Sequence, residues 1–144
     1  MTLQNRIIPF VVLAIGTIWS CQNADQLRQD MYYVNGRDLY KKHCQNCHGI
    51  SGEGLENLVP PLTDTAFLKT NKYRLACFIK YGIEGDTIRV AGRTYDGKMP
   101  ANEKIANIDI AQLIVYLTNS FGNSHGMYTA EQVAVDLEGC NKGR

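Results

Sequence analysis

Residues 44–48 read Cys44-Gln45-Asn46-Cys47-His48, and this short stretch decides what the chain folds around. Two residues separate the cysteines, so on a helix their thiols lie about one turn apart. His48 follows directly, so its imidazole is delivered from the same side as the two thiols. The pattern C-x-x-C-H is the haem c attachment motif, in which both thiols form thioethers with the haem and the histidine ligates the iron.

Two other kinds of site share part of this pattern. A thioredoxin-type dithiol follows a strand in a βαβ unit, and no such unit is predicted here. A four-ligand zinc site requires a second ligand pair, and the chain has no second C-x-x-C. The sequence therefore predicts one covalent haem c at Cys44 and Cys47, with His48 as the first axial ligand.

The iron of such a haem takes a second axial ligand, and the candidates are Met99, Met127, His125 and His43. His43 directly precedes Cys44 and cannot fold back over the opposite haem face. His125 and Met127 follow the last long predicted helix, in a stretch suited to a surface turn. Met99 lies in a turn-rich loop, residues 95–100, where Pro100 restricts the backbone. We expect Met99 to be the ligand, 51 residues after His48.

The N-terminus has the features of an export signal. Arg6 is the only charge before Asp25, and residues 7–19 form a mostly apolar run. This run is shorter than the roughly 20 residues that a membrane-spanning helix needs, and a short apolar core behind a basic residue is typical of a secretory signal. The run ends in Ser20-Cys21, which resembles the lipobox of bacterial lipoproteins.

We therefore expect residues 1–20 to be a lipoprotein signal peptide and Cys21 to carry lipid. The alternative is a plain signal peptide cleaved nearby, with Cys21 as a stray thiol. Residues 21–34 are polar and lack helical periodicity, so a flexible tether is expected there, followed by one domain over 35–144 with a C-terminal tail helix.

Composition limits the class of protein. The chain has 144 residues, of which 44% are hydrophobic, as in globular proteins. Its 15 Lys and Arg nearly balance its 14 Asp and Glu, so it lacks the basic excess of a nucleic-acid-binding protein.

Apolar periodicity and capping residues predict a mostly helical domain. Asn35 is a candidate N-cap, Ile110, Leu113, Ile114 and Leu117 share one face of a helix, and Thr129 with Gln132 fits a capping box. A loop is expected over 49–65 and a small hairpin over 87–95 around Ala91-Gly92. The predicted helices span 35–43, 71–81, 107–120 and 129–137.

Residues 35–122 resemble class I monohaem cytochromes c of the bacterial lipoprotein kind. The resemblance rests on C-x-x-C-H, on Pro60-Pro61-Leu62, on Met99-Pro100 and on the amphipathic closing helix. It implies an all-α fold of about four to five helices wrapped around one covalently attached haem, with a short β-hairpin before the Met99 ligand.

The resemblance also implies roles for particular residues. Gly36 and Tyr40 would lie where the first helix crosses the last, facing Leu113 and Tyr116. The carbonyl of either Pro60 or Pro61 would accept the Nδ1–H of His48, which fixes the tautomer of a ligating histidine. Tyr95 is also expected to contact the cofactor.

The function implied is electron transfer by a carrier that is not itself an enzyme. Its partners would be redox proteins such as respiratory complexes, with no small-molecule substrate, and a lipid anchor would hold it at the membrane facing the periplasm. Two alternatives are a haem c subunit of a larger oxidase or dehydrogenase, and a ligand-binding haem sensor or peroxidase. Surface lysines would either steer docking or be merely solvated: Lys42, Lys98 and Lys104.

Two cysteines have no role in the motif or the anchor. An exported protein matures in an oxidising compartment, where spare thiols pair. The sequence therefore predicts a disulfide between Cys77, on a predicted helix, and Cys140, in the C-terminal tail, which would clamp the tail onto the domain.

Overall fold

The computed structural model describes residues 4–140 of the chain, with side chains from residue 24 onward. The chain divides into two units, with the boundary between Met31 and Tyr32. The described part of the first unit is helical and belongs to α1 (Gln4–His43). Within residues 4–140, no helix combines the length and the apolar character that crossing a membrane requires.

Residues 22–34 are helical, which corrects the expectation of a tether without regular structure. The stretch contains neither glycine nor proline, and it includes three Gln as well as Ala24, Leu27, Arg28 and Met31, which have favourable helix propensities. The helix therefore forms without an apolar stripe. For the same reason Asn35 lies inside α1 and does not cap it.

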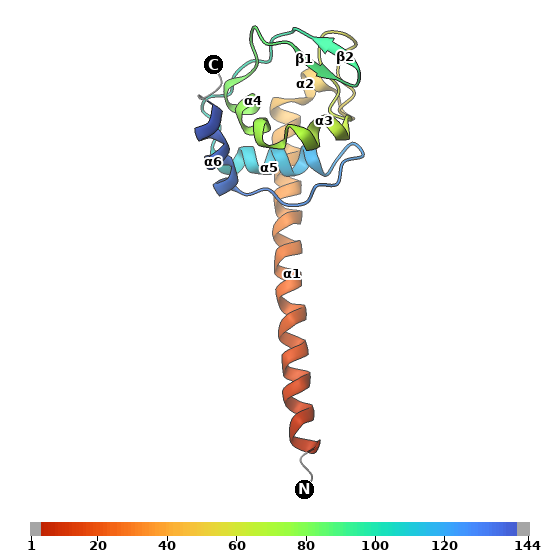
Figure 1. Ribbon diagram of the computed structural model, residues 1–144, viewed down its shortest axis with the longest axis vertical. Coiled ribbons are helices and arrows are strands. Elements are labelled where there is room, and N and C mark those ends of the chain that lie inside the picture. Colours follow the sequence, from red (N-terminus) through yellow and green to blue (C-terminus); the bar gives the residue numbers. More distant parts are fainter. Residues whose placement is uncertain (1–3, 141–144) are drawn as a thin grey trace. The chain divides into compact units, whose positions relative to one another are not determined.

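The described part of the second unit is mostly helical, with one small sheet (Figure 1). This confirms the predicted all-α class and the short hairpin. After α1 the elements are α2 (Gln45–His48), α3 (Thr65–Thr70), the 3-10 helix η1 (Lys72–Arg74), α4 (Leu75–Tyr81), β1 (Ile88–Val90), β2 (Arg93–Tyr95), α5 (Asn107–Thr118) and α6 (Ala130–Gly139).

The helix predicted over 71–81 is divided into η1 and α4, and α3 precedes it where the loop was expected to end. Asp64 starts α3, because its side chain accepts a hydrogen bond from the Phe67 amide and so satisfies one of the free donors of the first turn. The predicted hairpin is confirmed: Ile88 pairs with Tyr95 and Val90 with Arg93.

Helix α5 forms the centre of the core. Ile110, Leu113 and Ile114 are completely buried, and Leu117 is nearly so, which confirms the apolar face that periodicity predicted. In Figure 1, α5 crosses the C-terminal part of α1, and α6 lies near one end of α5.

The crossing of α1 and α5 is unusually close, because it takes place at Gly36. A Cβ at this position would collide with the carbonyl oxygen of Gln112 and lie 2.8 Å from the Cβ of Tyr116. One turn later, the buried ring of Tyr40 packs on Tyr116 with the ring centroids 5.2 Å apart. The pair Gly36 and Tyr40 thus lies against α5, as the resemblance implied.

Helix α6 is fixed to the domain at both ends. It begins with a capping box in which Thr129 and Gln132 bond each other's backbone amides, as predicted. At its far end, Cys140 forms a disulfide with Cys77 of α4, with 5.7 Å between the two Cα atoms. Between these points, the Asp136 carboxylate accepts a hydrogen bond from the Tyr128 hydroxyl.

Replacing Gly36 with Ala tests the helix crossing. Alanine in a helix is ordinarily favoured over glycine by about 1 kcal/mol, yet here its methyl group must push α1 and α5 apart. We expect a net loss of about 1–3 kcal/mol in the free energy of unfolding, measured by denaturant titration of the haem-loaded protein. Gly139→Ala in α6 is the control, because a Cβ there meets nothing within 4 Å. Equal effects at both positions would contradict the crossing geometry.

Candidate haem site

The C-x-x-C-H stretch occupies the turn that follows α1. The Cys44 amide still donates to the Tyr40 carbonyl, at 2.8 Å, whereas the amides of Cys47 and His48 both donate back to the Cys44 carbonyl. Residues 44–48 therefore form a single tight helical turn. Both cysteines are free thiols, half-buried at Cys44 and exposed at Cys47. Burial, helped by the neighbouring Cys47, raises the pKa of the Cys44 thiol to about 11.

His48 is held by one backbone acceptor. Its Nδ1 lies 3.1 Å from the carbonyl oxygen of Pro60, so the structure selects Pro60 over Pro61. With the Nδ1 proton engaged there, Nε2 carries the free lone pair that a metal needs. Burial lowers the pKa of His48, against the opposing effect of the Pro60 carbonyl, and so favours the neutral, ligating form.

The polypeptide after His48 folds back to bring Pro60 into reach. The Gly54 amide donates to the His48 carbonyl at 2.9 Å, and the Leu62 amide donates to the Gly52 carbonyl at 2.7 Å. The Tyr40 hydroxyl adds a 2.6 Å hydrogen bond to the Gly49 carbonyl. Pro60, whose carbonyl accepts the hydrogen bond from His48, thus lies on a loop that is itself hydrogen-bonded to α1.

His48 and Met99 line the same cavity. The empty space inside it, counted out to open solvent, is about 470 Å³. Its walls are mainly apolar. They comprise Cys47, His48, Leu58, Val59, Pro60, Ile83, Ile88, Tyr95, Gly97, Lys98, Met99 and Pro100.

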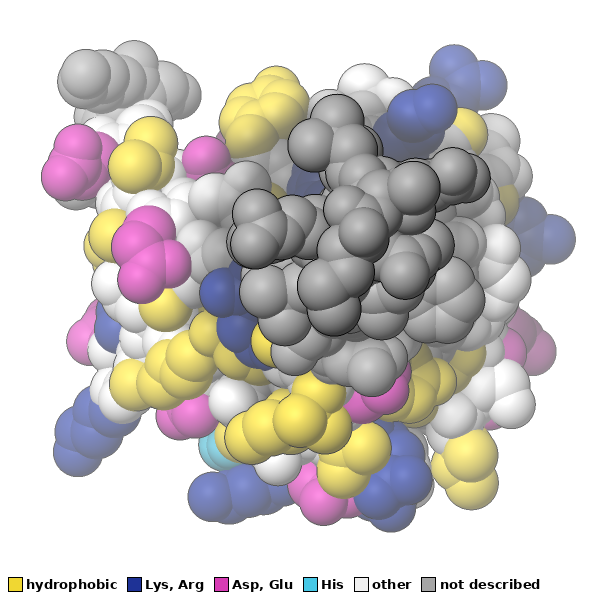
Figure 2. All heavy atoms as spheres, turned by 90° about the horizontal axis from the view of Figure 1, so that it is seen from below, with side chains coloured by type: hydrophobic (Ala, Val, Ile, Leu, Met, Phe, Trp, Pro, Cys, Tyr) yellow, Lys and Arg dark blue, Asp and Glu magenta, His cyan; other side chains and the backbone are white. Residues whose placement is uncertain are grey.

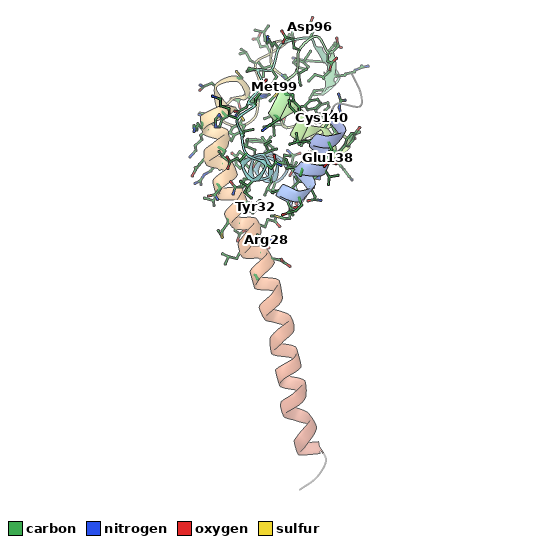
Figure 3. All side chains as sticks on the ribbon, turned by 90° about the vertical axis from the view of Figure 1, so that its left-hand side faces the viewer. Arg28, Tyr32, Asp96, Met99, Glu138 and Cys140 are labelled. Atoms are coloured by element: carbon green, nitrogen blue, oxygen red, sulfur yellow. A yellow bond between two sulfur atoms is a disulfide. The ribbon has the colours of Figure 1, made fainter. Side chains whose placement is uncertain are left out.

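Met99 comes from the coil after the hairpin, where Figure 3 labels it. Its backbone is paired with Ile83 just beyond α4, and the two residues exchange amide-to-carbonyl hydrogen bonds of 2.9 Å each. Tyr95, at the end of β2, is buried, lines the cavity and donates its hydroxyl hydrogen to the Glu56 carbonyl at 3.3 Å. The structure therefore places Tyr95 in the cavity wall, where a cofactor contact was expected.

The other candidate ligands do not line this cavity. His43 is exposed, with its Nδ1 3.4 Å from the Asn102 amide nitrogen. The His125 amide donates to the Thr118 carbonyl at 2.9 Å, and Met127 packs against the hydrophobic core. Neither belongs to the cavity wall that contains His48.

One residue that matters to the site, Asp64, was missed by the sequence analysis. While one carboxylate oxygen caps α3, the other accepts a 2.7 Å hydrogen bond from the Ala91 amide at the hairpin turn. It therefore fastens the turn of the hairpin whose Ile88 and Tyr95 form part of the cavity wall. The hydrogen bonds from Phe67 and Ala91 lower the pKa of Asp64. Its capping role is visible in the sequence, but its bond to the hairpin is tertiary.

The residues present fit a covalently bound haem. Two free thiols, a half-buried histidine with an unengaged Nε2 and a methionine lie on or beside one apolar cavity. In contrast, no cluster of three or more His, Cys, Asp or Glu suited to a metal ion occurs in the part of the chain that the structure describes. Two thiols, an imidazole and a thioether are donors that a covalently bound haem uses.

The sequence model of the Cytochrome c family matches residues 33–120, which is more than half of the chain. The chain belongs to the cytochrome c family, whose members bind haem c covalently. Domains of this family are typically electron carriers, and some are subunits of enzymes. The search of curated proteins gave no match.

Replacing Asp64 with Asn tests the fastening of the hairpin. Asparagine is also a good N-cap, but it has one acceptor oxygen where Asp64 uses two, so the change removes the charge and also the acceptor of the Ala91 amide. Because the pKa of Asp64 is lowered in the folded state, its contribution to stability is present above the ordinary aspartate pKa of about 3.9. It is then lost as the pH falls through the lower folded value. We expect a difference in thermal midpoint between wild type and variant that is present at neutral pH and shrinks in acid.

The control is Asp96→Asn, at an exposed position just after β2 (Figure 3). It should leave the pH dependence of the thermal midpoint as in the wild type. If the Asp64→Asn and wild-type curves run parallel from neutral to acidic pH, Asp64 does not hold the hairpin through its charge.

Proposed function

We propose that this chain is a membrane-tethered monohaem cytochrome that passes single electrons between respiratory redox proteins. Cys44 and Cys47 hold the haem covalently, and His48 and Met99 are its two axial ligands. The observation that carries the proposal is the single apolar cavity lined by both His48 and Met99, in a chain whose family binds haem c.

Ligation by two protein side chains restricts the chemistry of the site. With both axial positions filled there is no open position for a substrate, so the bound group supplies a reversible one-electron step. The side chains around the cavity set the reduction potential of that step. A neutral thioether at Met99 favours ferrous iron, and the apolar walls from Ile83 and Ile88 disfavour the extra positive charge of the ferric state. Both effects raise the potential.

A partner can reach the cofactor where the cavity wall meets solvent. Leu58 lines the cavity and is nevertheless 69% exposed, so apolar surface continues outward beside the site. Lys98 also lies at the cavity, but its ammonium pairs with Glu84 at 2.6 Å. Figure 2 views the molecule from below, away from α2 and the hairpin, and shows side chains of both signs interspersed on that face. Lys42 and Lys104 are also exposed, so they remain candidates for steering a partner toward the site.

The tether and the location are inferred from the leader. The short apolar run behind Arg6 directs export, Ser20 supplies the small residue before the processed cysteine, and Cys21 becomes the lipidated first residue. Two or more acyl chains anchor stably, whereas one binds only reversibly. Residues 1–23 lie outside the side chains that the structure describes, so this step rests on the sequence. The anchored domain faces the periplasm, an oxidising compartment compatible with the Cys77–Cys140 disulfide.

Replacing Met99 with Ala tests the axial ligand. Haem should remain attached, since Cys44, Cys47 and His48 are untouched. We expect loss of the weak far-red absorption band that reports iron–methionine ligation, a lower potential and binding of added cyanide, which the wild type resists. The measurements are visible spectroscopy, redox titration and cyanide titration of the oxidised protein.

Met127→Ala is the matched control and should keep the band. If Met127→Ala loses it while Met99→Ala retains it, the wrong methionine has been chosen. A wild type that binds cyanide as readily as Met99→Ala would favour a ligand-binding haem protein instead. Recovery from membranes only within a large oxidase or dehydrogenase assembly would favour the subunit alternative.

Replacing Cys21 with Ala tests the anchor. The full-length variant should lose its lipid and move from the membrane fraction to the soluble fraction, as followed by haem staining and by the mass of the extracted protein. Ser20→Ala keeps a small residue before the cysteine and should remain at the membrane. If parent and Cys21→Ala fractionate alike, Cys21 does not anchor the protein.

A further inference from the structure

The end of α4 lies directly against the backbone around Met99. Gly82 terminates α4, and its amide donates to the Phe78 carbonyl at 2.9 Å. The next residue, Ile83, exchanges its two hydrogen bonds with Met99. The antiparallel bridge between Ile83 and Met99 thus lies immediately after Gly82 and fixes the backbone of Met99.

Gly82 is required here for two independent reasons. Its φ is +71°, in the left-handed region that glycine enters without steric cost. A Cβ at this position would also collide with the carbonyl oxygen of Met99 and lie 2.8 Å from the Ala101 nitrogen and 2.9 Å from the Pro100 carbonyl carbon. All three are backbone atoms, so no rotation of a side chain relieves the contact.

The helix that Gly82 terminates is a firm support for this loop. Ala76 is completely buried and Ile79 nearly so, which fixes α4 in the core. Lys80 holds the segment beyond Met99 through its backbone and its side chain. Its carbonyl accepts a hydrogen bond from the Asn102 amide at 3.1 Å, and its ammonium donates one to the Ile105 carbonyl at 2.7 Å. The loop that carries Met99 is therefore attached to the C-terminal end of α4 both at the methionine and beyond it, at Asn102 and Ile105.

We propose that Gly82 is a positioning residue for the Met99 ligand. The missing Cβ lets the end of α4 pack directly on the carbonyl of Met99, and this close packing holds the methionine backbone where its side chain faces the cavity shared with His48. The inference rests on the proposed ligation by Met99.

A methyl group at position 82 would displace the Met99 backbone, because the Met99 carbonyl lies in its path. Displacement raises the fraction of molecules in which the thioether is off the iron. An added ligand binds that open fraction, so its apparent dissociation constant falls in proportion as the fraction rises. Competition by an external ligand therefore measures the positioning directly.

The test compares Gly82→Ala with Gly85→Ala in the oxidised, haem-loaded protein. Gly85 has a similar φ of +78°, but a Cβ there meets nothing within 4 Å, so the control carries the backbone strain without the collision. We expect Gly82→Ala to weaken the far-red iron–methionine band and to lower the imidazole dissociation constant at least about tenfold. Gly85→Ala should change that constant by less than about twofold.

Equal imidazole affinity in the two variants would overturn the positioning role. If Met99→Ala itself keeps the far-red band, the proposed ligation by Met99 is wrong. If Met99→Ala loses the band while Gly82→Ala keeps it, only the positioning role of Gly82 is wrong. Should Gly82→Ala not fold, hydrogen exchange in the wild type decides. The amides of Ile83 and Met99 should exchange far more slowly than that of Gly85, and exchange of all three at one rate would refute the proposal.

Discussion

The close contact between α1 and α5 at Gly36 supports everything else in the domain. Since no side chain separates Gly36 from the Gln112 backbone, the last two turns of α1 pack closely against α5, the most buried helix of the core. Those turns end at His43, directly before Cys44, so the attachment motif begins at a point fixed by core packing. Tyr40 extends the same contact, with its ring on Tyr116 and its hydroxyl on the Gly49 carbonyl just beyond the motif.

The site is assembled from two segments that approach the cavity separately. One is the motif with its returning loop, which places the Pro60 carbonyl beside His48. The other runs from α4 through the hairpin to Met99 and is fastened by Asp64 at its turn and by Ile83 at its end. The two segments belong to different parts of the sequence, and both rest on helices of the same core. Their common support allows two ligands far apart in the chain to line one cavity.

Local sequence patterns predicted the elements whose geometry is local. C-x-x-C-H fixed the cofactor, Ala91-Gly92 the hairpin, and Thr129 with Gln132 the start of α6, because spacing alone determines each of these. The helical state of residues 22–34 was missed, since those residues favour a helix by propensity without an apolar stripe. The choice between Pro60 and Pro61, the bond from Asp64 to the hairpin and the contact of Gly82 with Met99 all depend on how distant segments pack, which no local pattern contains.

The Cys77–Cys140 disulfide closes a covalent ring around much of the domain. The ring spans a sequence separation of 63 residues and includes the hairpin, Met99 and the whole of α5 and α6. Exposed loop tips are where proteases nick a folded chain, and the hairpin turn at Ala91 and Gly92 is such a tip. A cut there, or at any one bond inside the ring, would leave the two pieces joined through sulfur. The segment carrying Met99 would thus stay attached to the segment carrying His48 after a single cleavage.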